Sequence, residues 1–188
     1  MLFKSDKSLK EDPERLSLRR TEEFDLRRPE VSDGSKIFGL VEACKPLDIN
    51  SVYSYLLLCH HFAETCVVAE DKGEIVGFLS GYRPPDREKV FFVWQVAVAP
   101  RMRGQGLGKL LIAEALQRPA ARRCSFLETT ITPSNEASRR LFTSLARDLK
   151  ARCTIIPCFA GQHFGEENHE PEHLFRIGPF SLERVILL

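Results

Sequence analysis

The sequence predicts an α/β domain built on a central, twisted, mixed β-sheet with helices on both faces. Residues 65–70 and 74–82 are apolar runs joined by Asp71-Lys72-Gly73, a pattern typical of a β-hairpin with a tight turn. The apolar run 91–99 is followed by a glycine-rich turn and then by helical periodicity. A hairpin that precedes strand–helix units favours a mixed sheet covered by helices on both sides.

Apolar periodicity and turn residues define the elements in chain order. Strands are expected at residues 24–28, 65–70, 74–82, 91–99, 124–132, 152–158 and 174–177. Helices are expected from 33 to before Pro46, over 52–61, from 107 to before Pro119, and from a cap at Ser134 to about 149. Both prolines end a helix, because the residue before a proline disfavours helical backbone.

The predicted helix at 52–61 follows a turn in which Asn50 or Ser51 can act as the N-cap. The side chains expected to share one face of this helix are those of Tyr53, Leu56, Leu57 and His60. Residues 1–20 alternate basic and acidic side chains with few apolar ones, so we expect a mobile tail followed by one domain over 21–188.

Composition excludes several classes of protein. The 188 residues are 43% hydrophobic and 28% charged with a net charge of +1, which argues against nucleic acid or an acidic membrane as the partner. No apolar run approaches the ~20 residues needed to span a bilayer. The first residues lack the pattern of a signal peptide, so a cytoplasmic location is expected.

The six cysteines are widely spaced and include no C-x-x-C pair. They are Cys44, Cys59, Cys66, Cys124, Cys153 and Cys158. Most lie in apolar strand or helix patterns, so we interpret them as reduced core thiols and expect no metal site.

The glycine-rich turn after the 91–99 strand predicts a phosphate site. A strand that enters a helix through glycines leaves unpaired N–H groups at the positive end of a helix dipole. The turn is not a dinucleotide fingerprint, because Lys109 stands where the third glycine belongs, and it lacks the spacing of a P-loop. Its pattern is Arg101-x-x-Gly104-x-Gly106 after a strand that ends at Pro100.

This pattern resembles the pyrophosphate loop of the GCN5-related N-acetyltransferases (GNAT), which use acetyl-CoA. The second part of that family's motif is an asparagine-led helix after the next strand, here Asn135 to Phe142. Many members have a tyrosine where this chain has Phe142, and that tyrosine protonates the leaving thiolate, so another donor or water must serve here. The resemblance implies the GNAT fold and a homodimer.

The resemblance also implies which residues hold the cofactor. The strand backbone would hold the pantetheine arm and polarise the thioester, the turn amides would hold the pyrophosphate, and Asn135 would lie near the thiol end. The implied cofactor-binding residues are Val96, Ala97, Val98, Arg101, Arg103, Gly104, Gln105, Gly106, Leu107, Gly108, Asn135 and Ser138.

Longer stretches narrow the resemblance to the L-2,4-diaminobutyrate acetyltransferases of ectoine biosynthesis, the pathway to an osmoprotectant. The stretches that carry it are residues 44–62, 77–82, 92–98, 127–133 and 174–180. The implied reaction is transfer of acetyl from acetyl-CoA to the 4-amino group of L-2,4-diaminobutyrate, without an acyl-enzyme. Two alternatives stay open: an acetyltransferase for another small diamine or amino acid, and a non-catalytic acetyl-CoA sensor.

Charge distribution agrees with a cationic substrate. Residues 153–175 contain no Lys or Arg but do contain Glu166, Glu167, Glu170 and Glu172. Asp48 adds a carboxylate in the loop between two predicted helices. A carboxylate ~4 Å from an ammonium is worth about 4 kcal/mol at an effective dielectric of ~20, before desolvation is subtracted. Without the resemblance, a solvated acidic loop would explain the same segment.

We expect Asp48 and Glu172 to hold the charged substrate, with one of them or a bridging water taking the proton. Tyr53 is expected to orient that water or to donate to the thiolate. Trp94 would form an apolar wall, Thr130 would bond the substrate, and His169 would line the entrance of the site. His169-Glu-Pro-Glu-His173 also matches the H-E-x-x-H expression of zinc hydrolases, but Pro171 blocks the helix that this motif requires.

Overall fold

The computed structural model describes residues 24–165 and 169–186, and it contains a single seven-stranded sheet in the order β1-β2-β3-β4-β5-β7-β6. The strands are β1 (Asp25–Arg27), β2 (Val67–Asp71), β3 (Glu74–Tyr82), β4 (Val90–Val98), β5 (Phe126–Ile131), β6 (Cys153–Phe159) and β7 (Glu172–Ile177). Strands β4 and β5 pair in parallel and every other pair is antiparallel, so the predicted mixed sheet is confirmed. The expected tail at 1–20, together with Glu166 and Glu167, lies outside the described residues.

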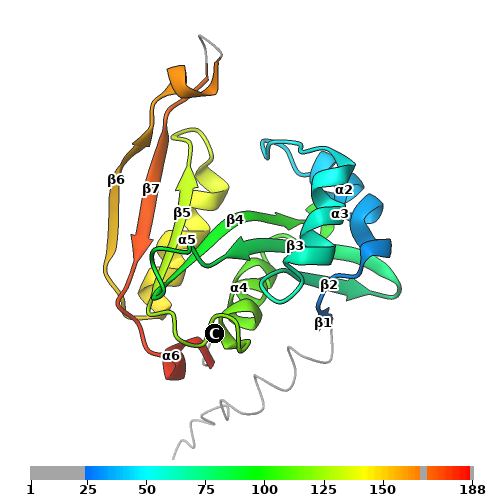
Figure 1. Cartoon of the computed structure of the whole chain (residues 1–188), viewed down its shortest axis with the longest axis horizontal. Helices are drawn as coiled ribbons and strands as arrows, with labels where there is room; N and C mark the ends of the chain where they lie inside the picture. Colours follow the sequence, from blue (N-terminus) through cyan, green and yellow to red (C-terminus); the bar gives the residue numbers. More distant parts are fainter. Residues whose placement is uncertain (1–23, 166–168, 187–188) are drawn as a thin grey trace, which may run out of the picture.

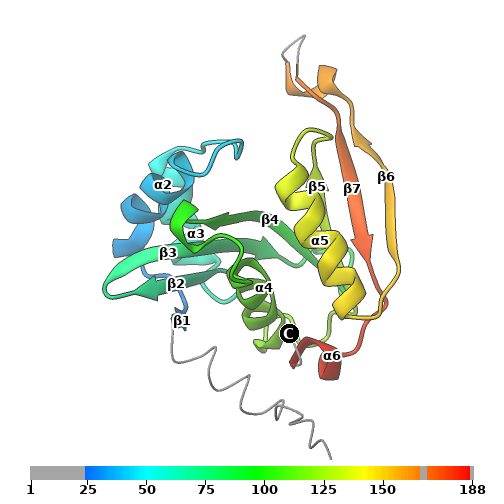
Figure 2. The same ribbon diagram turned by 180° about the vertical axis from the view of Figure 1, so that it is seen from behind.

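The helices cover both faces of this sheet, as predicted (Figures 1 and 2). They are α2 (Gly34–Glu42), α3 (Val52–His61), α4 (Leu107–Gln117), α5 (Glu136–Asp148) and α6 (Leu182–Ile186), with single 3-10 turns at Val31–Asp33, Pro100–Met102 and Gly161–Phe164. Helices α2 and α3 bury Ile37, Val41 and Tyr55 against one face. Helices α4 and α5 pack with Leu111 and Leu145 in the core on the other face. None of the described helices is long and apolar enough to cross a membrane.

One local expectation needs correction and two others are confirmed. The buried face of α3 carries Tyr55, Leu58 and Cys59, and the residues predicted to share a face with Tyr53 lie on its less buried side. Helix α5 is capped by Asn135, not by Ser134. Ser51, one of the two expected caps of α3, accepts a hydrogen bond from the Ser54 amide.

Two further differences concern the end of the chain and the cysteines. Strand β7 begins at Glu172, two residues before the expected start, and the short helix α6 had no signal in the sequence. Cys44, Cys59, Cys66 and Cys124 are buried free thiols, as predicted. Cys158 is instead exposed, at the end of strand β6.

An ion-pair cluster fixes the edge strand β1 to the sheet and to α2. The Arg27 guanidinium donates to both carboxylate oxygens of Asp33, at 2.7 and 3.0 Å, and also reaches Glu70 at 2.8 Å. Asp33 is only 3% exposed. Burial alone would raise the pKa of Asp33, but the hydrogen bonds from Arg27 and from the Glu30 amide hold that pKa below its usual range.

We expect Asp33→Asn to lower the free energy of unfolding at pH 7 by about 1–3 kcal/mol, because Arg27 loses its most buried partner. A carboxyl group with a lowered pKa contributes its full stabilisation above about pH 3.9, and that stabilisation is lost as the pH falls through the lowered pKa. Urea unfolding of both proteins from pH 7 to pH 2 should therefore show a difference that shrinks below pH 4. Asp25→Asn, at the exposed first residue of β1, is the matched control, and an equal loss of stability there would contradict the assignment.

Candidate active site

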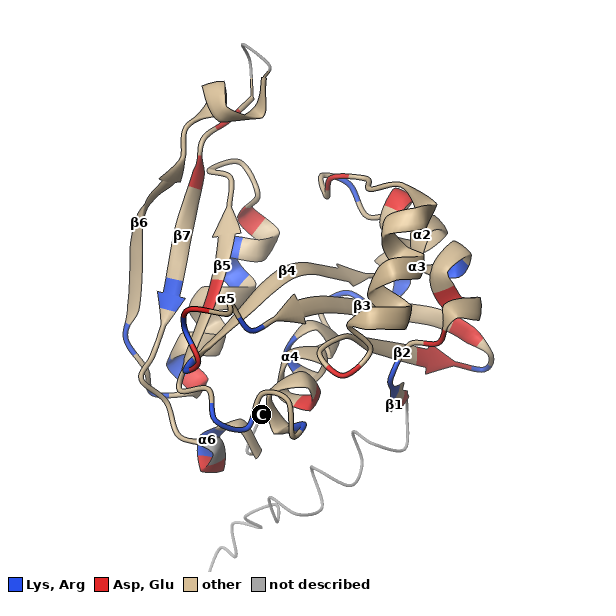
Figure 3. Ribbon diagram, in the orientation of Figure 1, with Lys and Arg blue, Asp and Glu red and all other residues tan. Residues whose placement is uncertain are grey.

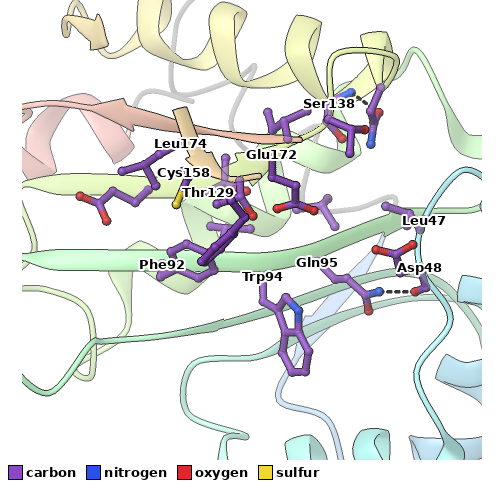
Figure 4. A pocket seen from close by; sticks show the side chains of 18 of the residues that line it. Leu47, Asp48, Phe92, Trp94, Gln95, Thr129, Ser138, Cys158, Glu172 and Leu174 are labelled. Carbon is purple, nitrogen blue, oxygen red and sulfur yellow. Dashed lines mark hydrogen bonds between the residues drawn. The ribbon is translucent and has the colours of Figure 1, made fainter. Parts of the chain in front are cut away.

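Strands β4 and β5 pair over only three residues and then diverge. Val90, Phe91 and Phe92 pair with 126–128, after which β4 continues to Val98 with β3 as its only partner among the described strands. Figure 1 shows the two strands separating like the arms of a V. A cavity of about 640 Å³ lies at this opening, lined by side chains of β4, β5, β7 and the loop before α3 (Figure 4).

A β-bulge at Trp94 re-aims the side chains of β4 toward this cavity. Ser80 pairs with Gln95 and Gly81 pairs with Val93, so Trp94 is the extra residue of the bulge. The alternation of the strand reverses there. Phe91 and Val93 join the core on the α4 side, whereas Ala97 joins the core under α2 and α3. Bulges of this kind are common beside active sites because they turn side chains and bend the strand.

The reversal turns the buried side chain of Gln95 toward the helical layer, where it holds the loop before α3 in place. Gln95 Nε2 donates to the Asp48 carbonyl oxygen at 2.7 Å, and the Tyr55 hydroxyl donates to Gln95 Oε1 at 3.3 Å. Asp48 therefore has a fixed backbone at the cavity wall. Sequence reasoning overlooked Gln95 and Tyr55, although a glutamine within an otherwise apolar strand was an available signal.

The two predicted carboxylates meet across the cavity. Asp48, from the loop before α3, and Glu172, the first residue of β7, face the same space in Figure 4. Trp94 lines the cavity from β4 with 46% of its surface exposed, and Thr130 lines it from β5. With His169, five of the six expected substrate-binding residues line this one cavity.

His169 also lines the cavity, and its surroundings favour one tautomer. Its ring stacks on Phe164 with centroids 3.8 Å apart, and Nδ1 lies 2.7 Å from the Glu170 carbonyl oxygen. Because a carbonyl oxygen only accepts, Nδ1 carries the hydrogen and Nε2 is left as an acceptor in the neutral ring. His173 lies within strand β7, so the two histidines do not share a helix as a zinc hydrolase requires.

Tyr53 does not join this group. It lies on the outer face of α3 with 67% of its surface exposed and is absent from the cavity lining. The cavity instead includes Arg87, Glu128 and Cys158, which sequence reasoning did not select. Partial desolvation of the sulfur, together with the neighbouring carboxylates Glu172 and Glu128, raises the pKa of the Cys158 thiol although the residue as a whole is exposed. This thiol is therefore poorly suited to be a nucleophile at neutral pH.

The glycine turn has the geometry expected of an anion site. Gly104 and Gly106 adopt φ of +79° and +84°, a backbone region that favours glycine, and Gly106 is the N-cap of α4. The amide N–H groups of residues 104–108 have no backbone acceptor within the described chain. A Cβ on Gly108 would lie 3.2 Å from Leu141, so this position also allows α4 to approach α5 closely.

Two of the expected cofactor residues are engaged elsewhere. The Arg101 guanidinium donates to Asp71 at 2.8 Å and to Glu74 at 3.0 Å, and these partners raise its pKa, with the Asp71 hydrogen bond the largest cause. Its charge is thus largely balanced by the β2–β3 turn. Arg103 donates through Nε to the Val98 carbonyl oxygen at 3.2 Å. The groups of this turn that are left for an anion are therefore mainly its backbone amides.

Three other expected cofactor residues line the cavity itself. These are Val96, Asn135 and Ser138, and Asn135 Oδ1 accepts from the Ser138 amide at 3.1 Å to begin α5. Phe142 also lines the cavity, where a tyrosine would supply a hydroxyl group. Ala97 is fully buried under α2 and α3, and the Val98 carbonyl oxygen already accepts from Cys44 Sγ at 3.3 Å. Two parallel strands that diverge, with a glycine-rich turn of unpaired amides after the first of them, form the arrangement found in N-acetyltransferases.

Comparison with known proteins agrees with this class. Residues 35–146 match the model of the acetyltransferase (GNAT) family. The chain therefore belongs to the GNAT family of acetyltransferases.

Within this family the similarity extends to enzymes of one specificity. The chain is 50% identical over 159 residues to the L-2,4-diaminobutyric acid acetyltransferase of Bordetella parapertussis. This alignment covers 84% of the present chain and 86% of the Bordetella enzyme. It is 47% identical over 161 residues to the enzyme of the same name from Chromohalobacter salexigens, covering 85% and 83% of the two chains. A solved structure of diaminobutyrate acetyltransferase EctA from Paenibacillus lautus, in complex with L-2,4-diaminobutyric acid and coenzyme A, superposes with a TM-score of 0.81 at 42% identity, covering 84% and 96% of the chains.

We expect Gly106→Ala to raise the dissociation constant of coenzyme A about 10-fold, because a side chain at φ of +84° costs roughly 1–2 kcal/mol and displaces the amides of the turn. Isothermal titration calorimetry with coenzyme A measures this effect. Gly39→Ala is the control, since Gly39 is helical and a Cβ there meets nothing within 4 Å. Unchanged binding by Gly106→Ala would show that the turn does not hold the cofactor.

Proposed function

We propose that this chain transfers the acetyl group of acetyl-CoA to the 4-amino group of L-2,4-diaminobutyrate, giving N4-acetyl-L-2,4-diaminobutyrate in ectoine biosynthesis. The observation that carries the proposal is the pair of carboxylates, Asp48 and Glu172, that face one cavity at the divergence of β4 and β5. The diaminobutyric acid acetyltransferases that resemble the chain over more than four-fifths of its length support the same substrate.

The residues present fit the cofactor. The unpaired amides of 104–108 suit a pyrophosphate, and the edge of β4 beyond Phe92 offers backbone groups to an extended arm. Val96, Asn135 and Ser138 lie where that edge meets the cavity. When bound, acetyl-CoA supplies the acetyl group as a reactive thioester.

The cavity must both bind the charged form of the amine and remove a proton from it before the amine can react. An amine with a pKa near 10.4 is neutral about once in a few thousand molecules at pH 7, which is a handicap of ~4–5 kcal/mol. Asp48 and Glu172 hold the diamine, and one of them takes the proton directly or through a water. His169 accepts that proton at Nε2, becomes an imidazolium, and releases the proton to solvent.

The remaining roles follow from the cavity wall. Trp94 shields the reacting amine on its apolar side, and Thr130 offers a hydroxyl group from β5. Tyr53 is too exposed on α3 to act within this protomer, and Phe142 has no proton to give, so water protonates the leaving thiolate. Direct attack by the amine agrees with the raised pKa of Cys158.

We expect Asp48→Asn and Glu172→Gln each to lower kcat/KM for the diamine roughly 100-fold while coenzyme A binding is retained, since a charged partner of the substrate is lost. Release of coenzyme A measures turnover, and NMR of the product shows which nitrogen carries the acetyl group. Glu183→Gln, on α6, is the control. Acetylation at N2, or normal kinetics in both variants, would contradict the proposal, and turnover of another diamine in preference would reassign the substrate.

We also propose that the protein is a homodimer and that it acts in the cytoplasm. Edge strand β6 exposes Ile155, Ile156 and Phe159, and an exposed apolar edge favours pairing with a second copy. The buried free thiols suit a reducing compartment.

Sedimentation equilibrium should give twice the mass of the chain for the wild type and a shift toward monomer for Ile156→Lys, because a charge on this face opposes its burial. Ile186→Lys, an exposed isoleucine on α6, should remain dimeric. A monomeric wild type would refute the dimer, and dimeric Ile156→Lys would move the interface elsewhere.

A further inference from the structure

The proposed substrate carries a carboxylate as well as two ammonium groups, and the cavity offers one strong cationic partner. Among the described residues that line it, Arg87 is the only lysine or arginine. Asp48 and Glu172 suit the ammonium groups but would repel the carboxylate. Arg87 comes from the loop between β3 and β4, on a different element from either of them.

A buried carboxylate fixes the position of Arg87. Its Nη1 donates to Glu128 Oε2 at 2.5 Å, and Glu128 is 1% exposed on β5. One of the five N–H groups of the guanidinium is used in this bond, and 43% of the side chain is exposed. Asp86 lies 3.9 Å from Nε but is 82% exposed, so solvent screens its charge.

Glu128 is shared between two arginines, which leaves a positive excess at this wall of the cavity. Arg176 Nη1 donates to Glu128 Oε1, and the Arg176 guanidinium stacks 4.2 Å above the Phe126 ring. One carboxylate facing two guanidinium groups gives the Arg87–Glu128–Arg176 cluster a net charge of +1. Strand β7 begins with the acidic Glu172 and carries the basic Arg176 further along, and Figure 3 shows this change of charge along the strand.

This positive wall lies close to the acidic one. Arg87, Glu128, Cys158 and Glu172 all line this cavity, and Phe159, next to Cys158 on β6, pairs with Glu172 on β7. A basic amino acid carries both kinds of charge, so its ammonium groups find carboxylate partners and its carboxylate finds a guanidinium partner in the same cavity. A diamine without a carboxylate would use only the acidic wall.

We propose that Arg87 binds the α-carboxylate of the substrate, and that Glu128, held by Arg176, is the positioning residue that presents it. The cluster thereby selects basic amino acids over simple diamines. This inference rests on the proposed function and extends it to the residue that sets substrate specificity.

The test compares L-2,4-diaminobutyrate with 1,3-diaminopropane, which keeps both amines and lacks the carboxylate. We expect Arg87→Gln to raise KM for diaminobutyrate roughly 10- to 100-fold and to change KM for diaminopropane less than about 3-fold. Arg87→Lys should recover part of the loss, because it restores the charge but not the planar fork. Arg122→Gln, an exposed arginine before β5, is the matched control.

Each other outcome overturns the inference. An equal loss on both substrates would mean that Arg87 only supports the fold, and unchanged kinetics would mean that another group holds the carboxylate. If the melting transition of Arg87→Gln differs from that of the wild type, its kinetics do not test the inference. The test is then made on the wild-type enzyme, with 2,4-diaminobutyramide, in which an amide replaces the carboxylate, as the second substrate. The amide must then show a KM raised by a similar factor, and an equal KM refutes the inference. A wild type that acetylates no diaminobutyrate refutes the proposed function instead.

Discussion

The early end of pairing between β4 and β5 is the constraint on which the rest of the site depends. Parallel strands normally satisfy one another's backbone groups along their whole length, but here contact ceases after Phe92. Beyond that point β4 keeps β3 on one side, and its other edge meets the cavity. The same divergence separates α5 from the loop before α3, and the cavity lies between them.

The bulge at Trp94 divides the strand into two functional halves. Before it, Phe91 and Val93 belong to the core that supports α4 and α5, and after it, Gln95 turns to the helical layer and binds the loop that carries Asp48. Gly81 lies opposite the bulge, where a Cβ would come within 2.7 Å of the Phe91 ring. A glycine on β3 and one extra residue on β4 thus place the acidic wall of the site.

The charges that face the cavity are decided by which side chains form ion pairs, and not by how many charged residues the nearby sequence contains. The acidic segment before β7 supplies Glu172, but Glu128 is neutralised by two arginines and Arg101 is balanced by the β2–β3 turn. Of the charges that the sequence suggests for ligand binding, that of Arg101 is paired within the protein, whereas those of Asp48 and Glu172 line the cavity. What remains open to the cavity is the pair of carboxylates Asp48 and Glu172, which come from two different elements, and the guanidinium of Arg87.

The sequence by itself determined the order of the strands, the helices up to α5 and the glycine turn, because periodicity and glycine-rich turns are local features. It also selected Asp48, Trp94, Thr130, His169 and Glu172, which the structure places around one cavity, and their roles stay predictions. It misplaced Tyr53, since both faces of α3 are apolar enough to be buried. It also overlooked Glu128 and Arg87, which are 41 residues apart. Only the tertiary structure decided which distant charges pair, because ion pairing depends on distance in space and not on position along the chain.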